Sequence, residues 1–227
     1  MEERNTVKFK KEEFSIKEFI QNYLGKGKIS KTRIEYTPVG ERIHLTTHKP
    51  GLIIGRKGEK IQELTMQLKK NFKLTNPKVE IEEVTEPELD AKIMADEIAL
   101  GLERFGPIKF KVIAYRTLQK IMKAGALGVE IRLNGKLPSS RAKPWRFAQG
   151  YLKKTGEPAK LVDRAQSRAQ TKPGTVGVKV SILSPYVKLI DQIDIDEKLL
   201  VKLKENSEEK AEEIKVIKKV KKKTKKK

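Results

Sequence analysis

Two glycines enclose two cations in the segment Ile54-Gly55-Arg56-Lys57-Gly58-Glu59-Lys60-Ile61. Apolar residues then recur at helical spacing up to Phe72, so a helix is predicted to start just after Gly58. A glycine lets the backbone approach a phosphate group without a Cβ atom in the way. The N-terminus of the following helix directs free N–H groups toward the same place. The segment therefore predicts a loop that holds a sugar-phosphate chain, and a simple turn between two elements is the alternative.

The residues on both sides of this loop predict a defined order of helices and strands. A helix is predicted over residues 15–24, because Ser15 and Glu18 form a capping box and Gly25 ends the apolar periodicity. A short helix is expected just before the loop. Alternating apolar and polar residues predict three strands, at residues 33–37, 43–47 and 79–83.

The order helix, strand, strand, short helix, G-x-x-G loop, helix, strand is that of a type II KH domain, which we place at residues 13–86. In KH domains this loop clamps about four nucleotides of single-stranded nucleic acid. We therefore predict that RNA contacts the loop at Gly55, Arg56, Lys57, Gly58 and Lys60.

Residues 87–185 predict a second domain, in which two helices cover one mixed or antiparallel sheet. A second capping box, Thr85 to Glu88, predicts a helix that runs to about Arg104 and has Phe105 on its apolar side. Pro107 is suited to start another helix, which ends near Lys123. Strands are predicted at residues 129–133, 141–152 and 177–183.

The fold class is thus α+β. A type II KH domain is followed by a C-terminal α/β domain of two helices on a sheet, and then by residues 186–227. These last residues predict an acidic connector and a Lys-rich tail that stays disordered until it meets an anion.

The formal charge of +21 is distributed unevenly along the chain. Residues 1–103 contain 19 Lys and Arg against 18 Asp and Glu, whereas residues 104–172 contain 17 against 3. The last 14 residues contain 9 Lys and no acid. Such a charge on a chain without an apolar run of membrane-spanning length is typical of a protein that binds a polyanion, most often nucleic acid. The basic segment within foldable sequence is the stronger indication, because a Lys tail also serves solubility.

The cations of the second helix of this domain lie opposite its apolar residues. Because no acid occurs between Arg104 and Ala126, this side of the helix predicts RNA contact, with a merely solvated face as the alternative. In the following strand, cations alternate with Trp145 and Phe147, a pattern suited to backbone contact and base stacking. Since these two aromatic residues share one side of the strand, we assign them to the core and the cations to the surface. The predicted RNA-binding residues of this domain are Lys109, Arg116, Lys120, Lys123, Arg141, Lys143 and Arg146.

The sequence offers little for catalysis or metal binding. It has no cysteine, which excludes a disulfide framework, a thiol nucleophile and a thiolate zinc site, and which indicates a reducing compartment. Walker A, G-x-S-x-G and H-E-x-x-H motifs are absent. His44 and His48 share one side of a strand without a further ligand. A solvated linker explains Asp191, Asp194 and Asp196 better than a cation site does. We therefore predict no enzyme, no cofactor, no metal and no small-molecule substrate. The polar, acidic N-terminus predicts no secretory signal.

Several motifs, in the same order, resemble those of the family of the third protein of the small ribosomal subunit, in its archaeal or eukaryotic form. They are the G-R-K-G loop and the residues at 85–92, 125–137, 141–143, 150–151 and 174–180. The resemblance extends from about residue 14 to residue 185. It implies a cytoplasmic ribosomal protein with a type II KH domain and a C-terminal α/β domain. It also implies a place in the head of the small subunit, bound to ribosomal RNA beside the channel through which mRNA enters, with the tenth and fourteenth proteins of the subunit as neighbours.

One departure concerns the start of the second C-terminal helix. Bacterial members of the family carry a denser cation cluster there, linked to unwinding of mRNA, whereas this chain keeps Lys111 but has Val112 and Tyr115 nearby. We add Lys111 to the predicted RNA-binding residues and carry over the location near mRNA, but not the unwinding.

Two alternatives stay open. Eukaryotic relatives are credited with a DNA-lesion lyase activity, although no residue here identifies its nucleophile. A free KH regulator of transcription, or a KH appendage of a GTPase, is disfavoured by the single G-x-x-G motif and by the absence of a nucleotide-phosphate loop.

Overall fold

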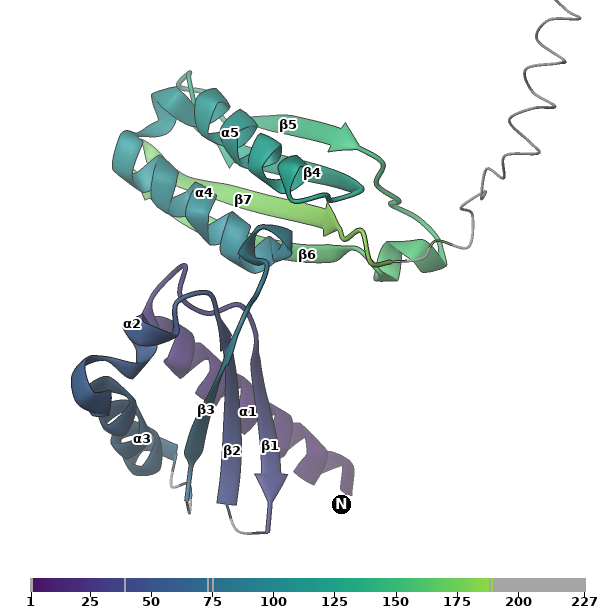
Figure 1. The fold of residues 1–227 in the computed structure, drawn as a ribbon. Helices are drawn as coiled ribbons and strands as arrows, with labels where there is room; N and C mark the ends of the chain where they lie inside the picture. Colours follow the sequence, from purple (N-terminus) through teal and green to yellow (C-terminus); the bar gives the residue numbers. More distant parts are fainter. Residues whose placement is uncertain (1, 39, 73, 75, 188, 190–227) are drawn as a thin grey trace, which may run out of the picture. The chain divides into compact units, whose positions relative to one another are not determined.

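The first part of the chain builds a three-stranded sheet with helices packed on one of its faces. The structure, a computed structural model, describes residues 2–38, 40–72, 74, 76–187 and 189. The order of elements is α1 (Glu2–Leu24), β1 (Thr32–Thr37), β2 (Gly40–Thr47), α2 (Pro50–Ile54), a 3-10 turn at Arg56–Gly58, α3 (Glu59–Phe72) and β3 (Lys78–Glu83). This is the order predicted for a type II KH domain, and Figure 1 shows it in purple and blue.

The sheet of this domain has the strand order β1-β2-β3. Strands β1 and β2 are antiparallel, whereas β2 and β3 run parallel because α2 and α3 connect them. Ile43 and Leu45 of β2 are fully buried, and they pack with Ile20 of α1 and with Leu64 and Leu68 of α3. The apolar residues that recur at regular spacing in these segments of the sequence therefore line a common core.

Helix α1 differs from its prediction at its start. It begins at Glu2 and not at Ser15, and the Ser15 hydroxyl donates to the carbonyl of Lys11 inside the helix (2.9 Å). The predicted capping box at Ser15 is therefore wrong. Glu13 forms ion pairs with Lys10, three residues before it, and with Lys17, four residues after it. Pairs at these spacings stabilise a helix. The predicted end is confirmed.

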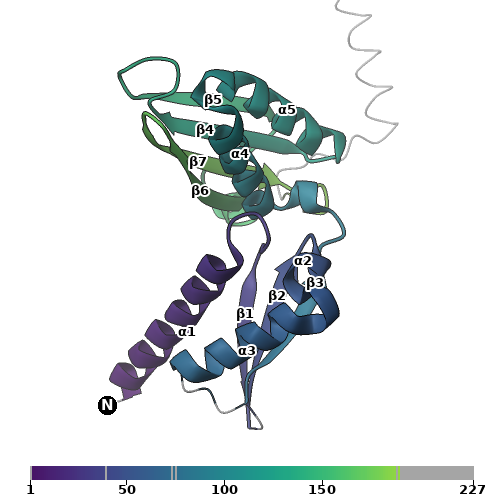
Figure 2. The same cartoon turned by 90° about the vertical axis from the view of Figure 1, so that its left-hand side faces the viewer.

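The second part of the chain folds into an antiparallel four-stranded sheet with two helices on one face. Its order is a 3-10 turn at Pro87–Leu89, α4 (Ala91–Phe105), a 3-10 turn at Pro107–Lys109, α5 (Phe110–Lys123), β4 (Gly128–Gly135), β5 (Lys143–Gly150), a 3-10 turn at Glu157–Lys160, β6 (Asp163–Thr171) and β7 (Gly174–Leu183). The strand order is β5-β4-β7-β6, and every pairing is antiparallel. Figure 2 shows α4 and α5 together on the same side of this sheet.

The inner face of this sheet provides the second core. Ile131, Leu133, Val178 and Val180 are buried against α4 and α5. Phe147 is buried and Trp145 is partly buried, and the Trp145 ring lies 5.0 Å from that of Phe110. The assignment of these two aromatic residues to the core is confirmed.

Three details of the second domain correct the predictions. The N-cap of α4 is Asp90 and not Thr85, since residues Pro87–Leu89 form a separate 3-10 turn before the helix. Phe105, expected in the core, is 55% exposed at the last position of α4. Strand β6 was not predicted, because the sequence Asp163–Thr171 is polar and has only alanines as apolar residues.

The boundary between residues 86 and 87 stays a prediction. Ile81 packs against the core of the first domain and Val84 against the core of the second. The chain therefore passes from one core to the other between these two residues, close to the predicted boundary. The Lys-rich tail, most of the acidic connector and Asp191, Asp194 and Asp196 lie outside the described residues. Among the described helices, none combines the length and the apolar character that crossing a membrane requires.

Candidate nucleic-acid interface

The G-x-x-G loop is a tight turn with glycine conformations at both ends. Gly55 has φ 74° and ψ −173°, a region that essentially only glycine adopts, and Gly58 has φ 80°. Between them Lys57 also has a positive φ, 51°. The side chains of Arg56 and Lys57 are exposed. The fold therefore places four of the five predicted residues in this turn and Lys60 in the first turn of α3 directly after it, and it leaves both central cations available to an anion.

The positive charge of this loop comes from its side chains more than from the helix that follows. Helix α3 begins at Glu59, whose carboxylate lies in the first turn and partly offsets the positive end of the helix dipole. Leu52 and Ile54 of α2 are exposed just before the loop, at 47% and 39%. Cations next to exposed apolar side chains suit a single strand of RNA, whose backbone is charged and whose bases are apolar on their faces.

The predicted cations of α5 do not all have the same surroundings. Lys109, Arg116 and Lys123 are exposed, whereas Lys120 is partly buried and forms an ion pair with Glu97 of α4. The sequence of α5 alone could not show this partner, because Glu97 belongs to the neighbouring helix.

Lys111 lies apart from these cations and close to aromatic rings. Its Nζ is 5.1 Å from the centre of the Trp145 ring and 6.0 Å from that of Phe110, within the range of cation–π interactions. Lys109 is similarly placed 5.9 Å from the ring of Phe105. Both lysines are therefore exposed and lie beside aromatic rings.

The predicted RNA-binding residues of the loop and strand after Leu137 lie in two different parts of the domain. Arg141 and Lys143 are exposed before and at the start of β5. Arg146 lies on the face of the sheet that points away from α4 and α5, where its guanidinium hydrogen-bonds the Glu130 carboxylate. The structure thus separates Arg146 from the cations of α5 by the thickness of the sheet.

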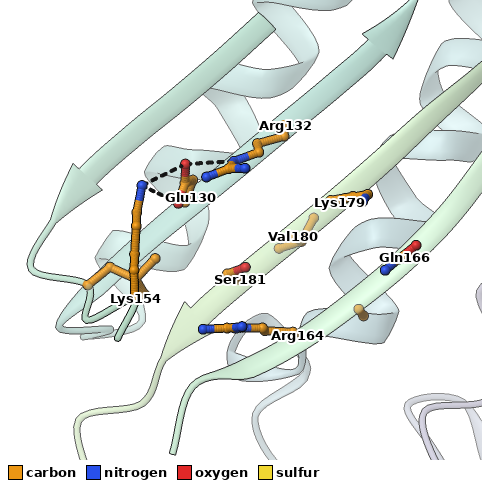
Figure 3. A pocket seen from close by; sticks show the side chains of 10 residues that line it. Glu130, Arg132, Lys154, Arg164, Gln166, Lys179, Val180 and Ser181 are labelled. Atoms are coloured by element: carbon orange, nitrogen blue, oxygen red, sulfur yellow. Dashed lines mark hydrogen bonds and ion pairs between the residues drawn. The ribbon is translucent and has the colours of Figure 1, made fainter. Parts of the chain in front are cut away.

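Around Glu130, the structure assembles a basic cluster of which only Arg146 was predicted from the sequence. The Glu130 side chain is only 5% exposed, and its carboxylate accepts from Arg132 Nε (2.9 Å) and Lys154 Nζ (3.1 Å) as well as from Arg146. Figure 3 shows Arg132 and Lys154 converging on it. Burial by itself would raise the pKa of Glu130, but the hydrogen bonds from the three cations outweigh it and lower the pKa to about 2.

The same outer face holds Arg164 of β6 and Lys179 of β7 (Figure 3). A signal for Arg132 and Lys179 was present in the sequence. Arg132 alternates with buried Ile131 and Leu133, and Lys179 with buried Val178 and Val180. An alternation of period two places such cations on the solvent face. Lys154 and Arg164 lacked such a signal, because one lies outside a strand and the other on the polar strand β6.

The His44 ring lies among carboxylates of neighbouring strands. His44 lies 3.4–3.5 Å from carboxylate oxygens of Glu35, Glu80 and Glu82. Within the described ranges, no group of three or more ligand-type side chains has an arrangement that could hold a metal ion.

Comparison with known proteins follows the division into two domains. A family model described as KH domain matches residues 15–89, and one described as Ribosomal protein S3, C-terminal domain matches residues 98–182. Small ribosomal subunit protein uS3 of Methanocaldococcus jannaschii is 40% identical over 203 residues, which cover 89% of this chain and 97% of that protein. The protein of the same name from Methanosphaera stadtmanae is 39% identical over 90% of this chain and 81% of its own length. That from Halobacterium salinarum is also 39% identical, over 80% of this chain and 60% of its own length. The KH domain, the C-terminal domain and this identity over most of both chains show that the chain belongs to the small ribosomal subunit protein uS3 family.

Proposed function

We propose that this protein is a structural, non-catalytic component of the small ribosomal subunit that binds small-subunit ribosomal RNA in the head, near the channel through which mRNA enters. The observation that carries the proposal is the 40% identity over 97% of the length of an archaeal uS3 protein. Two further observations support it: the KH loop exposes two cations, and residues 104–172 carry a large excess of basic residues.

In this proposal the C-terminal domain provides most of the anchoring and the KH loop holds a single-stranded or irregular RNA segment. Neutralising phosphates with Lys and Arg gives an affinity that depends strongly on salt and little on sequence. Folded domains then fix where along the RNA the protein sits. Lys109, just before α5, and Lys111, Arg116 and Lys123 of α5 are exposed and have no ion-pair partner among the described residues.

Neighbouring head proteins, the tenth and fourteenth of the subunit, are the proposed protein partners. Exposed apolar side chains near the junction of α4 and α5 are consistent with a protein contact, since Ile108 is 85% and Val112 67% exposed. Assistance in unwinding mRNA is not part of the proposal, because Val112 and Tyr115 stand where the further cations of bacterial members would be.

The test is incorporation into the small subunit, measured by sedimentation of reconstituted subunits in sucrose gradients at moderately high salt. The variant changes Lys109, Arg116, Lys120 and Lys123 to Gln. We expect weaker co-sedimentation and a shallower dependence of the affinity for ribosomal RNA on salt, by about 0.7 to 0.9 in slope for each lost phosphate contact. The matched control interchanges Lys and Arg at the same positions and so keeps the charge.

Unchanged incorporation and an unchanged salt slope would show that α5 does not anchor the protein. A separate variant, Arg56→Asp with Lys57→Asp, tests the loop. If it binds every ribosomal RNA fragment as well as the parent protein does, the loop does not clamp RNA.

A further inference from the structure

The outer face of the C-terminal sheet, opposite α4 and α5, carries one continuous row of long polar side chains across all four strands. The strand register places Arg146 of β5 opposite Arg132 of β4, Arg132 opposite Lys179 of β7, and Lys179 opposite Gln166 of β6. With strands about 4.8 Å apart, this row is roughly 14 Å long. Three of its four members are cations.

One of the two neighbouring rows of the same face adds one acid and one further cation. Glu130 is opposite Ser181, and Ser181 is opposite Arg164. Lys154, which follows β5, reaches Glu130 from outside the sheet. We call these side chains the outer basic face: Arg132, Arg146, Lys154, Arg164 and Lys179, with Glu130 at their centre.

The charges of the outer basic face do not balance. Glu130 is the only acid among these rows and neutralises one of five cations. Within the described part of the chain, Arg164 and Lys179 form no ion pair. Like charges directly opposite one another on neighbouring strands destabilise a sheet. The cations of this face therefore repel one another, which lowers the stability of the sheet. A bound anion would reduce this repulsion.

A hollow of about 340 Å³ lies over this face and gives an anion room to bind (Figure 3). Arg132, Lys154, Arg164 and Lys179 line it, together with the hydroxyl of Ser181 and the amide of Gln166. Guanidinium groups bind phosphate oxygens through two parallel hydrogen bonds, while ammonium, hydroxyl and amide groups add single donors. Glu130 restrains two of the cations at the edge of this hollow, so they do not have to be ordered when a ligand arrives.

We infer that the outer basic face binds the phosphate backbone of a structured, double-helical segment of RNA, as a contact separate from the one assigned to α5. The row extends beyond the size of a single phosphate group, which favours a polymer over a free ion. The rows contain no aromatic side chain, so they suit backbone contacts rather than base stacking, and proteins recognise double-helical RNA mainly by shape and backbone. Because α4 and α5 cover the opposite face of the sheet, the C-terminal domain would lie between two RNA segments. This inference rests on the proposed function in ribosomal RNA binding.

The test uses the full chain and the variant Arg164→Gln with Lys179→Gln, which removes the two unpaired cations and leaves the Glu130 cluster intact. The probe is a fluorescently labelled RNA duplex of mixed sequence, titrated at several KCl concentrations. We expect a several-fold loss of affinity and a fall of about 1.5 in the salt slope, since each lost phosphate contact accounts for about 0.7 to 0.9. The matched control, Arg164→Lys with Lys179→Arg, keeps the charge and should bind nearly as the parent does. Urea unfolding of each variant, and the single variant Lys179→Gln, separate a binding defect from a folding defect.

An unchanged salt slope in a folded variant would overturn the inference. If the variant lost as much affinity for a poly-glutamate peptide as for the RNA duplex, the inference would also fail. The face would then be assigned to an acidic protein segment. Hydroxyl-radical footprinting on reconstituted subunits completes the test. The outer-face variant and the α5 variant should each expose a different segment of ribosomal RNA, and loss of the same segment in both would contradict a separate contact. If the α5 variant fails to incorporate while the outer-face variant behaves as the parent does, the inference fails and the proposed function stands. If the parent chain itself does not co-sediment with small subunits, the proposed function fails.

Discussion

A Cβ atom placed on Gly55 would lie 2.8 Å from Cγ of Lys60, closer than such atoms approach in folded proteins. The contact joins the first glycine of the G-x-x-G loop to the first turn of α3, and it involves the base of the lysine side chain rather than its flexible end. Gly55 is therefore required for its lack of a side chain as well as for its backbone conformation.

The substitution Gly55→Ala should destabilise the KH domain by about 1–3 kcal/mol, because alanine is strained at this φ and ψ and would displace Lys60. Gly58→Ala should cost only about 1–2 kcal/mol, since its φ is also positive but the space beside it is open. Urea unfolding monitored by circular dichroism measures both. Gly51→Ala, in α2 and with nothing within 4 Å, is the control. A Gly55→Ala protein as stable as this control would contradict the argument.

The Glu130 cluster makes stability depend on pH in a defined direction. The pKa of Glu130 is lowered to about 2 in the folded protein, against an ordinary value of 4.5. The folded state therefore gains stability from the ionised carboxylate above about pH 4.5 and loses it as the pH falls toward 2. The full shift corresponds to roughly 3 kcal/mol as an upper limit.

We expect Glu130→Gln to be less stable than the parent at pH 7 by about 2–3 kcal/mol, and to show a flatter dependence of the unfolding free energy on pH between 5 and 3. Urea titrations at several pH values measure this. Glu157→Gln is the control, because its ion pair with Lys160 is exposed and contributes less than about 1 kcal/mol. Parallel pH curves for the parent and Glu130→Gln would show that the cluster does not act in this way.

Two carboxylates satisfy the free N–H groups at the start of α4. Asp90 Oδ1 accepts from the N–H groups of Lys92 (2.8 Å) and Ile93 (3.2 Å), and Asp163 Oδ2 accepts from that of Ala91 (3.1 Å). Asp90→Ala should therefore cost about 1–2 kcal/mol, which lowers the melting temperature by several degrees. Asp90→Asn keeps the acceptor and should recover most of the loss in a thermal unfolding experiment. Equal melting temperatures for Asp90→Ala and the parent would rule out Asp90 as the cap.

The cations of α5 should differ in their contribution to RNA binding. Lys120 is paired with Glu97, so Lys120→Gln should reduce the affinity for ribosomal RNA less than Arg116→Gln does. Glu97→Gln should raise the affinity, because it frees Lys120 and removes a negative charge from the same surface. Titrations at two salt concentrations measure all three variants. A larger effect of Lys120→Gln than of Arg116→Gln would contradict the assignment of Lys120 to the ion pair.

The accuracy of the sequence-based predictions depended on how local their physical cause is. The G-x-x-G loop, the strand at Ile43 and the helix ending at Phe72 are set by glycine positions and by short apolar periodicities, and they were found. The start of α1 was placed at Ser15 because a capping box was assumed, whereas the residues before it continue the helix. The start of α4 was placed at Thr85, although Asp90 and the distant Asp163 hold it.

The sequence by itself determined the KH domain, its loop and the excess of positive charge in the second domain. Only the tertiary structure decided which of those charges act together. Strand pairing placed Arg132, Arg146, Arg164 and Lys179 on one face, whereas α5 lies on the other. The register between strands distant in the chain depends on the packing of the whole sheet against its helices. Local periodicity can show which way a side chain points, but it cannot show which strand lies beside it.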